Sequence, residues 1–236
     1  MKIFFNGDSH TNGAELIDPL NETYSYRLAK LLNADIVGNP AKSGVSNDRI
    51  LRTTEDFIRE CETYPDLIVI GWSEPLRFDW FYNEQYRTSR SLEDGFSIEE
   101  AKQHDPIRYE YLVDVLRNDL GYAHHVYQQN QMYNLHEKLN YLKIPHLFFN
   151  AHMSFDYCLK RTQLFLPYLR HHQFNWDNSF WNPYHETDGC FLTWGKNRNY
   201  KATEHDHLES NAHLEFSQVL FNHINSHIIK SCSTNN

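Results

Sequence analysis

KIFFNGDS, residues 2–9, is the most informative segment for the fold, because an unbroken apolar run there ends at Asn6-Gly7 and gives way to polar residues. A similar run, DLIVIGWS, occupies residues 66–73, and HLFFN occupies residues 146–150. Continuous apolar runs rich in β-branched and aromatic residues are typical of strands buried on both faces of a parallel sheet. We therefore predict strands at residues 2–6, 35–38, 67–70 and 146–149.

Amphipathic segments separate these runs. Side chains suited to a core recur there at helical spacing: Tyr24, Leu28, Leu31 and Leu32; Ile50, Thr54, Phe57, Ile58 and Cys61; Met132, Leu135, Leu139 and Leu142; and Phe216, Val219, Leu220 and Ile224. Ser46 or Asn47 can cap the second helix, and the last helix begins near Ser210. The alternation predicts an α/β fold of three layers, α/β/α, with a mostly parallel sheet of about five strands.

The chain of 236 residues suits one α/β domain, expected over residues 1–230, with a C-terminal tail at residues 231–236. Residues 78–121 are charged, Tyr-rich and weakly helical, which indicates an inserted lid or loop region rather than a second domain. Residues 171–206 form another irregular region, rich in aromatic residues, Asn and His.

Composition narrows the function classes. The net charge of −9 gives no electrostatic reason to expect nucleic-acid binding, which needs clustered Lys and Arg. No stretch approaches the roughly 20 apolar residues of a membrane span, and the N-terminus carries no signal-peptide core. We therefore expect a soluble protein made in the cytoplasm. The four cysteines form no CxxC pair, which favours buried free thiols over disulfides.

Three of the predicted strands are followed by residues that can carry chemistry. Ser9 directly follows the first strand, Gly44 lies in the loop after the second, and Ser73 follows the third. A serine at the edge of a sheet can act as a nucleophile, and a backbone N–H or a hydroxyl can stabilise an oxyanion. Each residue also has an ordinary interpretation, such as a helix cap at Ser9 or a turn at Gly44.

A fourth segment, EHDHLESNAH at residues 204–213, places His207 just before the last predicted helix, with Glu204 and Asp206 nearby. A histidine beside an acid is the arrangement that supplies a general base to a serine. A single histidine is more often a packing or surface residue, so His207 is distinguished by its position in the chain.

In chain order, these segments resemble the four sequence blocks of the SGNH (GDSL-type) hydrolases. The GDS block is matched by residues 7–9, and the second block, N-x-G-x-x-G, corresponds to NPAKSG at residues 39–44, with Ala41 in place of the first glycine. The third block, G-x-N-D, corresponds to GWSE at residues 71–74, which departs from it at two positions. The last block, D-x-x-H-P, corresponds to EHDHL at residues 204–208. The variant third block and SGVSNDRI, residues 43–50, are also similar to SGNH-like proteins of tailed bacteriophages.

The resemblance implies a flavodoxin-like sheet and a serine-dependent hydrolase of acyl or acetyl esters, with glycan esters among the candidate substrates. It makes Ser9 the nucleophile and His207 its base. The orienting acid would be Glu204 or Asp206, with Glu204 preferred because it holds the family's spacing. Neither a cofactor nor a metal is implied.

The same resemblance assigns the oxyanion donors and a substrate rim. The backbone N–H groups of Ser9 and Gly44 would bind the oxyanion, and Ser73 stands where the family has asparagine, whose loss as a donor typically costs about 10²–10³ in turnover. The expected rim consists of Asp8, His10, Asn47, Trp72 and Arg77. Arg77 can instead be structural and pair with Glu74 or Asp79.

Two other functions stay open. The degraded third block favours an SGNH-fold virion or scaffolding protein, alone or in a homo-oligomeric assembly. The spacings Asp8-x-His10 and His205-x-His207 suit a metal-dependent phosphoesterase, although no Gly-Asn-His segment completes a two-metal site. The aromatic residues Trp176, Phe180, Trp181 and Tyr184 would form a contact surface or a sugar-stacking rim, although aromatic clusters in long loops more often serve packing.

Overall fold

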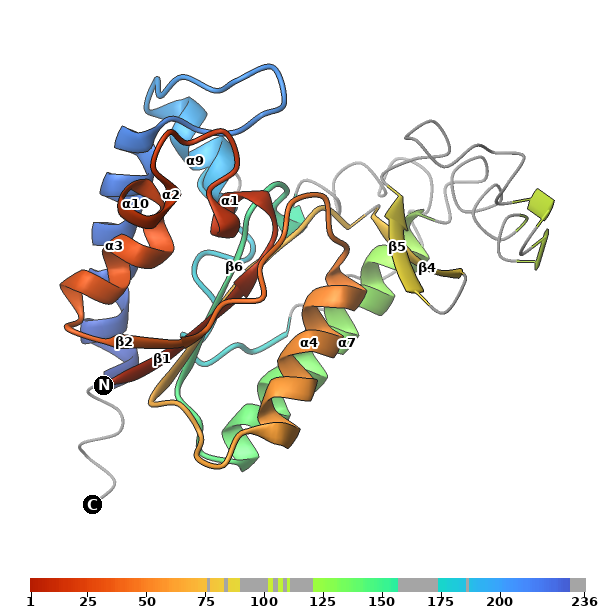
Figure 1. Ribbon diagram of the computed structural model, residues 1–236, viewed down its shortest axis with the longest axis horizontal. Helices are drawn as coiled ribbons and strands as arrows, with labels where there is room; N and C mark the ends of the chain where they lie inside the picture. The colour runs from red at the N-terminus through yellow and green to blue at the C-terminus, as the bar shows by residue number, and fades with distance from the viewer. Residues whose placement is uncertain are drawn as a thin grey trace.

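The fold is built on a parallel sheet. The computed structural model describes residues 1–75, 77–82, 85–89, 102–103, 106–107, 110, 121–156, 174–185 and 187–229. Its main sheet contains β1 (Lys2–Gly7), β2 (Asp35–Gly38), β3 (Leu67–Trp72) and β6 (His146–Asn150), all parallel and in the order β2-β1-β3-β6. The four predicted strands are therefore confirmed, and the fold is α/β (Figure 1).

About five strands were expected; beside β6, the described residues form a single parallel bridge between Phe148 and Phe180. The Phe148 N–H donates to Ser179 O at 2.7 Å, and the Trp181 N–H donates to Phe148 O at 2.8 Å. Left-handed backbone at residues 177, 178 and 182 interrupts the extended conformation on both sides of the bridge. The described sheet consequently has four strands, not about five.

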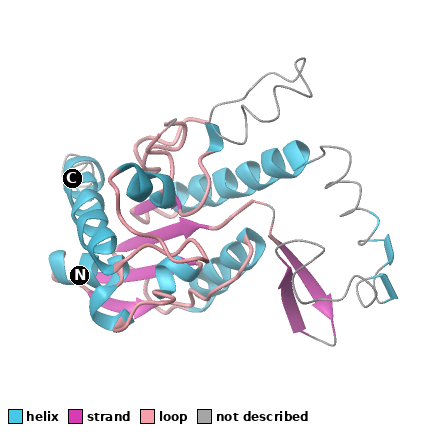
Figure 2. Cartoon of the chain, turned by 90° about the horizontal axis from the view of Figure 1, so that it is seen from above, coloured by secondary structure: helices cyan, strands magenta, loops and turns pink. Residues whose placement is uncertain are grey.

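Alternate residues of β1, β3 and β6 face two separate cores. One face of β1, represented by Ile3 and Phe5, packs with α3 (Tyr24–Leu31), α9 (Phe191–Asn197) and α10 (Ser210–His223). The opposite face, represented by Phe4, packs with α4 (Asn47–Glu60) and α7 (Gly121–Tyr141). Figures 1 and 2 show these helices on the two sides of the sheet. Such coverage explains why the strands are apolar at nearly every position.

The predicted helices are present, with small differences. The Ser46 hydroxyl caps α4 by accepting from the Arg49 N–H at 3.2 Å. Helix α10 continues into a π-helical turn, η1 (Ile224–Ile228). Leu31 was expected on the core face of α3, but it is 41% exposed. Two short helices, α1 (Ser9–Asn12) and α2 (Pro19–Glu22), lie between β1 and α3.

The expected insertion at residues 78–121 begins as an antiparallel hairpin of β4 (Phe78–Tyr82) and β5 (Gln85–Ser89), rather than as weak helix. Asp79 fixes the hairpin to α4, because its carboxylate accepts from the Ser46 hydroxyl at 2.6 Å and contacts Arg52 Nη2 at 3.0 Å. Most of residues 90–120 lie outside the described part of the chain.

The rings of the aromatic loop at residues 176–184 serve mainly as packing, the alternative to a contact surface or a sugar-stacking rim. Trp176, Phe180 and Trp181 are each at most 5% exposed and belong to the two cores. Tyr184 is half-buried, and its hydroxyl accepts from the Phe174 N–H at 2.8 Å. These rings therefore supply apolar burial beside β6 in place of a further strand.

Two of the cysteines lie in the described residues, and both are free thiols. Cys190 is buried as expected, whereas Cys61 is only half-buried at the end of α4. Cys158 and Cys232 lie outside the described residues. Among the described helices, none has the length and apolar character needed to cross a membrane.

Candidate functional site

Polar residues gather at the carboxyl ends of β1, β3 and β6. Asp8 and Ser9 follow β1, Ser73 follows β3, and His152 lies two residues after β6. Neighbouring parallel strands end at the same edge, so residues distant in sequence meet there. All four residues are at least nine-tenths buried.

Asp8 is the centre of this cluster and is fully buried. Its Oδ2 lies 2.8 Å from His152 Nε2 and 3.7 Å from Arg77 Nη1, and its Oδ1 accepts from the His10 N–H at 3.0 Å. Burial alone would raise the pKa of Asp8, but the charge and close contact of His152, followed by His10 and Arg77, hold it well below its usual value. Asp8 is therefore an ionised carboxylate at neutral pH.

Ser9 is the first residue of α1 and is 2% exposed. Its Oγ has no hydrogen-bond partner among the residues that the structure describes. The turn into α1 requires glycine at position 7, because a Cβ there would lie 2.8 Å from Gly71 O on the neighbouring strand. This close approach of β1 and β3 places Ser9 at the edge of the sheet, as the sequence predicted.

His10 is surrounded by other imidazole rings. Its centroid lies 4.7 Å from that of His152, 5.5 Å from His207 and 6.4 Å from His213. Burial, together with the charge of His152, lowers the pKa of His10 well below its ordinary value. Within the described residues neither ring nitrogen has a partner. His10 is thus a neutral ring between two histidines that each contact a carboxylate.

His207 is held by an acid that the sequence analysis missed. Its Nδ1 lies 2.8 Å from Glu15 Oε2, in the loop between α1 and α2. The Thr203 hydroxyl donates to the same Glu15 oxygen, and the His207 N–H donates to that hydroxyl at 3.2 Å. These contacts, first the Thr203 hydrogen bond and then His207, lower the pKa of Glu15. A neutral His207 ring bonded to Glu15 through Nδ1–H carries its lone pair on Nε2.

The expected orienting acids lie elsewhere, which corrects that assignment. Glu204 has an 87% exposed side chain and contacts His205 Nε2 at 3.5 Å. Asp206 adopts a left-handed backbone and contacts Lys196 Nζ at 2.5 Å. Although Glu204 and Asp206 are close to His207 in sequence, neither side chain contacts its imidazole ring. Glu15 occupies the position beside Nδ1 that was expected for one of them.

Ser73 is fixed by two side chains. The Ser73 N–H donates to Asn47 Oδ1 at 2.7 Å, and Asn47 Nδ2 donates to Ser73 O at 3.2 Å. Arg77 Nη1 donates to Ser73 Oγ at 2.8 Å, and Arg77 Nε lies 3.7 Å from Glu74. Because Arg77 can only donate, the Ser73 hydroxyl proton is left to bind an acceptor. Arg77 is thus paired with Glu74, as the structural alternative expected, and with Asp8, whereas Asp79 contacts Arg52.

The remaining predicted residues occupy two different settings. Gly44 is exposed, with φ of 74°, and its loop reaches β1 where the Lys42 N–H donates to Gly7 O at 3.3 Å. Trp72 is 1% exposed and belongs to the core beneath α4 and α7. Within the described residues, no three His, Cys, Asp or Glu side chains are arranged to hold a metal ion. The side chain of His205, which the metal alternative paired with His207, is 61% exposed.

Fold and site together define an α/β protein with a buried carboxylate–histidine–arginine cluster and a serine at the carboxyl edge of its parallel sheet. Residues 15–168, more than half of the chain, match the model of a family of unknown function (DUF6071), and the chain belongs to that family. The matched range includes Glu15, Asn47, Ser73 and His152, while Ser9 and His207 lie outside it. No curated protein matches the chain.

We predict that Asp8→Asn lowers the free energy of unfolding by about 3 kcal/mol, because it removes the buried charge that both His152 and Arg77 contact. The matched control is Asp206→Asn, whose half-exposed pair with Lys196 contributes at most about 1 kcal/mol. Urea unfolding followed by circular dichroism gives both values. Equal effects of the two substitutions would contradict the importance assigned to Asp8.

Proposed function

We propose that this protein is a serine-dependent ester hydrolase of the SGNH type, with a flavodoxin-like sheet, in which Ser9 is the nucleophile and His207 its base. The observation that carries the proposal is the contact between His207 Nδ1 and Glu15 at 2.8 Å. A histidine held by a carboxylate through one nitrogen and basic at the other is what a serine nucleophile needs. Its proximity to His10, the neighbour of Ser9, adds support.

In the proposed reaction, Ser9 Oγ attacks the ester carbonyl carbon while His207 Nε2 takes the hydroxyl proton. Collapse of the tetrahedral intermediate breaks the ester C–O bond, and the same proton passes to the leaving alcohol. Water then attacks the acyl-enzyme, with His207 again acting as base, and Ser9 is restored when the carboxylic acid leaves. Glu15 holds the imidazole ring and stabilises the imidazolium that forms in each half-reaction.

The oxyanion would be bound by the backbone N–H groups of Ser9 and Gly44 and by the Ser73 hydroxyl. Arg77 and Asn47 support this role of Ser73, because they fix its side chain and backbone while leaving the hydroxyl proton available. The 2% exposure of Ser9 favours a short acyl group such as acetyl. A glycan ester in a virion-associated setting is the proposed context.

The first test is hydrolysis of p-nitrophenyl acetate. Ser9→Ala and His207→Ala should each remove nearly all turnover, because members of a catalytic unit are strongly non-additive. Chelation with EDTA should have no effect, whereas a metal-dependent phosphoesterase would lose its activity and would act on phosphate esters. Turnover of neither ester class by the folded protein would favour the non-enzymatic virion role instead.

The second test concerns the orienting acid. Glu15→Gln should lower kcat/KM for the same ester by about 10²–10⁴, because an amide can donate to Nδ1 and favour the tautomer that protonates Nε2. Glu15→Asp should retain more activity than Glu15→Gln. The matched controls are Glu204→Gln and Asp206→Asn, which should stay close to the unsubstituted protein. A large loss in either control with none at position 15 would return the role to the last segment.

A further inference from the structure

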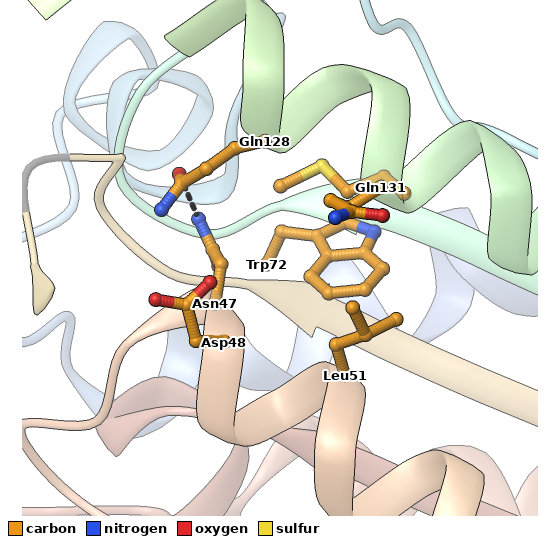
Figure 3. A pocket seen from close by; sticks show the side chains of 7 residues that line it. Asn47, Asp48, Leu51, Trp72, Gln128 and Gln131 are labelled. Carbon is orange, nitrogen blue, oxygen red and sulfur yellow. Dashed lines mark hydrogen bonds between the residues drawn. The ribbon is translucent and has the colours of Figure 1, made fainter. Parts of the chain in front are cut away.

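Helix α7 is joined to α4 and to the sheet by polar contacts as well as by its apolar face. In its first half, Gln128 Oε1 accepts from Asn47 Nδ2 at 2.9 Å (dashed line in Figure 3). In its second half, His136 Nδ1 lies 2.8 Å from Nε2 of His146, the first residue of β6. His136 is completely buried and His146 is 2% exposed, so this second contact is made away from water.

The protons of the two imidazole rings can be placed from their partners. His146 Nδ1 lies 2.9 Å from Ile144 O, which can only accept, so this nitrogen carries a proton. In the neutral ring Nε2 of His146 is then an acceptor, and the proton between the rings belongs to His136 Nδ1. Nε2 of His136 is left as an acceptor, and Asn140 Nδ2 donates to it at 3.1 Å. One arrangement of protons thus satisfies all four ring nitrogens.

The pair can accept one further proton but not two. A first proton can be held at Nε2 of His136, because Glu137 Oε1 lies 3.7 Å away and the exposed amide of Asn140 can turn its oxygen toward the ring. A second proton would be carried by Nε2 of His146, so two N–H groups would face each other across 2.8 Å. Two positive charges would then be buried side by side, and the contact would have to open.

The charged groups around the pair favour this order of protonation. Burial lowers the pKa of His136, but Glu137 of α7 and Asp177 of the aromatic loop face this ring and partly offset the effect. Burial also lowers the pKa of His146, to about 4, and the charge of His136 adds to this effect although the hydrogen bond to Ile144 O opposes it. His136 therefore takes the first proton and His146 the second.

We propose that His136 and His146 form an acid-sensitive latch between the second half of α7 and the start of β6. The latch holds while the pair carries at most one added proton, and it opens when both rings are charged. Opening also loosens the aromatic loop, because Trp176 packs on His136 with ring centroids 5.6 Å apart. The latch lies at the amino end of β6, so it does not depend on ester hydrolysis at the opposite edge of the sheet.

The latch makes the stability of the fold depend on pH in one direction. The pKa of His146 in the folded protein lies below its ordinary value of 6.5, so the unfolded chain takes up the proton first as the pH falls. The latch therefore contributes its full stability above about pH 6.5 and loses it as the pH falls toward 4. Between pH 7.5 and 4.5, this linkage lowers the ratio of folded to unfolded protein by about 10²-fold.

The first test is ¹⁵N NMR of the histidine side chains of the unsubstituted protein, whose long-range couplings report which ring nitrogen is protonated. At pH 7.5 we expect both rings of the latch to be neutral and to carry their proton on Nδ1. On acidification Nε2 of His136 should gain a proton while His146 stays neutral. A proton on Nε2 of either neutral ring at pH 7.5, or two charged rings while the amide signals of α7 stay unchanged, would refute the latch.

The second test removes both rings. His136→Met together with His146→Leu replaces two hydrogen-bonded side chains by apolar ones, which leaves no ring nitrogen unpaired. In urea unfolding, the fall in the folded-to-unfolded ratio from pH 7.5 to 4.5 should be about 10²-fold smaller in this variant than in the unsubstituted protein. The other buried histidines are common to both proteins, so the difference isolates the latch.

The matched control is His227→Gln, which changes an exposed histidine and should keep the full fall in stability on acidification. An equal fall in the double variant and the unsubstituted protein would overturn the proposal. The NMR measurement needs no substitution to detect the proton arrangement, so the latch can be refuted even if the double variant does not fold.

Discussion

The contact of Asp8 with Arg77 and His152 is the constraint on which the carboxyl edge of the sheet depends. Asp8 is fully buried, so its charge is tolerable only with partners inside the protein. Arg77 follows β3 and His152 follows β6, so one carboxylate draws together the ends of three neighbouring strands. The same residue accepts from the His10 N–H and so begins the helix that carries Ser9. Local helix capping and long-range charge pairing thus meet in a single side chain.

The remaining polar groups of the edge follow from this arrangement. Arg77, oriented toward Asp8, also donates to Ser73, and Ser73 is held from the other side by Asn47. His152, oriented toward Asp8, packs on His10, which in turn packs on His207. A chain of contacts therefore runs from Asn47, at the start of α4, to the Glu15–His207 pair. It gives the proposed nucleophile, base and oxyanion donors a rigid support, which precise placement of reacting groups requires.

The sequence predicted what depends on local patterning. The strands and the core helices were placed correctly because burial on both faces of a parallel sheet imposes a continuous apolar run, and amphipathic spacing marks a helix. The polar residues that directly follow the predicted strands also placed Ser9 and Ser73 at the same edge of the sheet. The hairpin at Phe78–Ser89 was missed, since charged, Tyr-rich sequence there gives no clear period. A fifth strand was expected from the fold class, and left-handed residues beside Phe180 prevent it in the described residues.

The acid was beyond sequence reasoning for a specific physical cause. Glu15 and His207 are 192 positions apart, and Glu15 reaches the ring from a left-handed backbone in an irregular loop. Family spacing pointed to Glu204, whose side chain is instead exposed. His152 was missed for a similar reason, because its importance derives from Asp8 on another strand. The sequence left packing, a contact surface and a sugar-stacking rim open for the aromatic loop around Trp176, and apolar burial beside β6 accounts for it.

The most direct measurement of the central claim is covalent labelling of the folded protein with a fluorophosphonate, followed by peptide mass spectrometry. Such reagents phosphonylate a serine that an adjacent base activates, with loss of fluoride. We expect one modified peptide, carrying the adduct on Ser9, and no adduct when His207 is replaced by alanine. An unlabelled Ser9 in the folded, unsubstituted protein, or an adduct that persists without His207, would contradict the central claim.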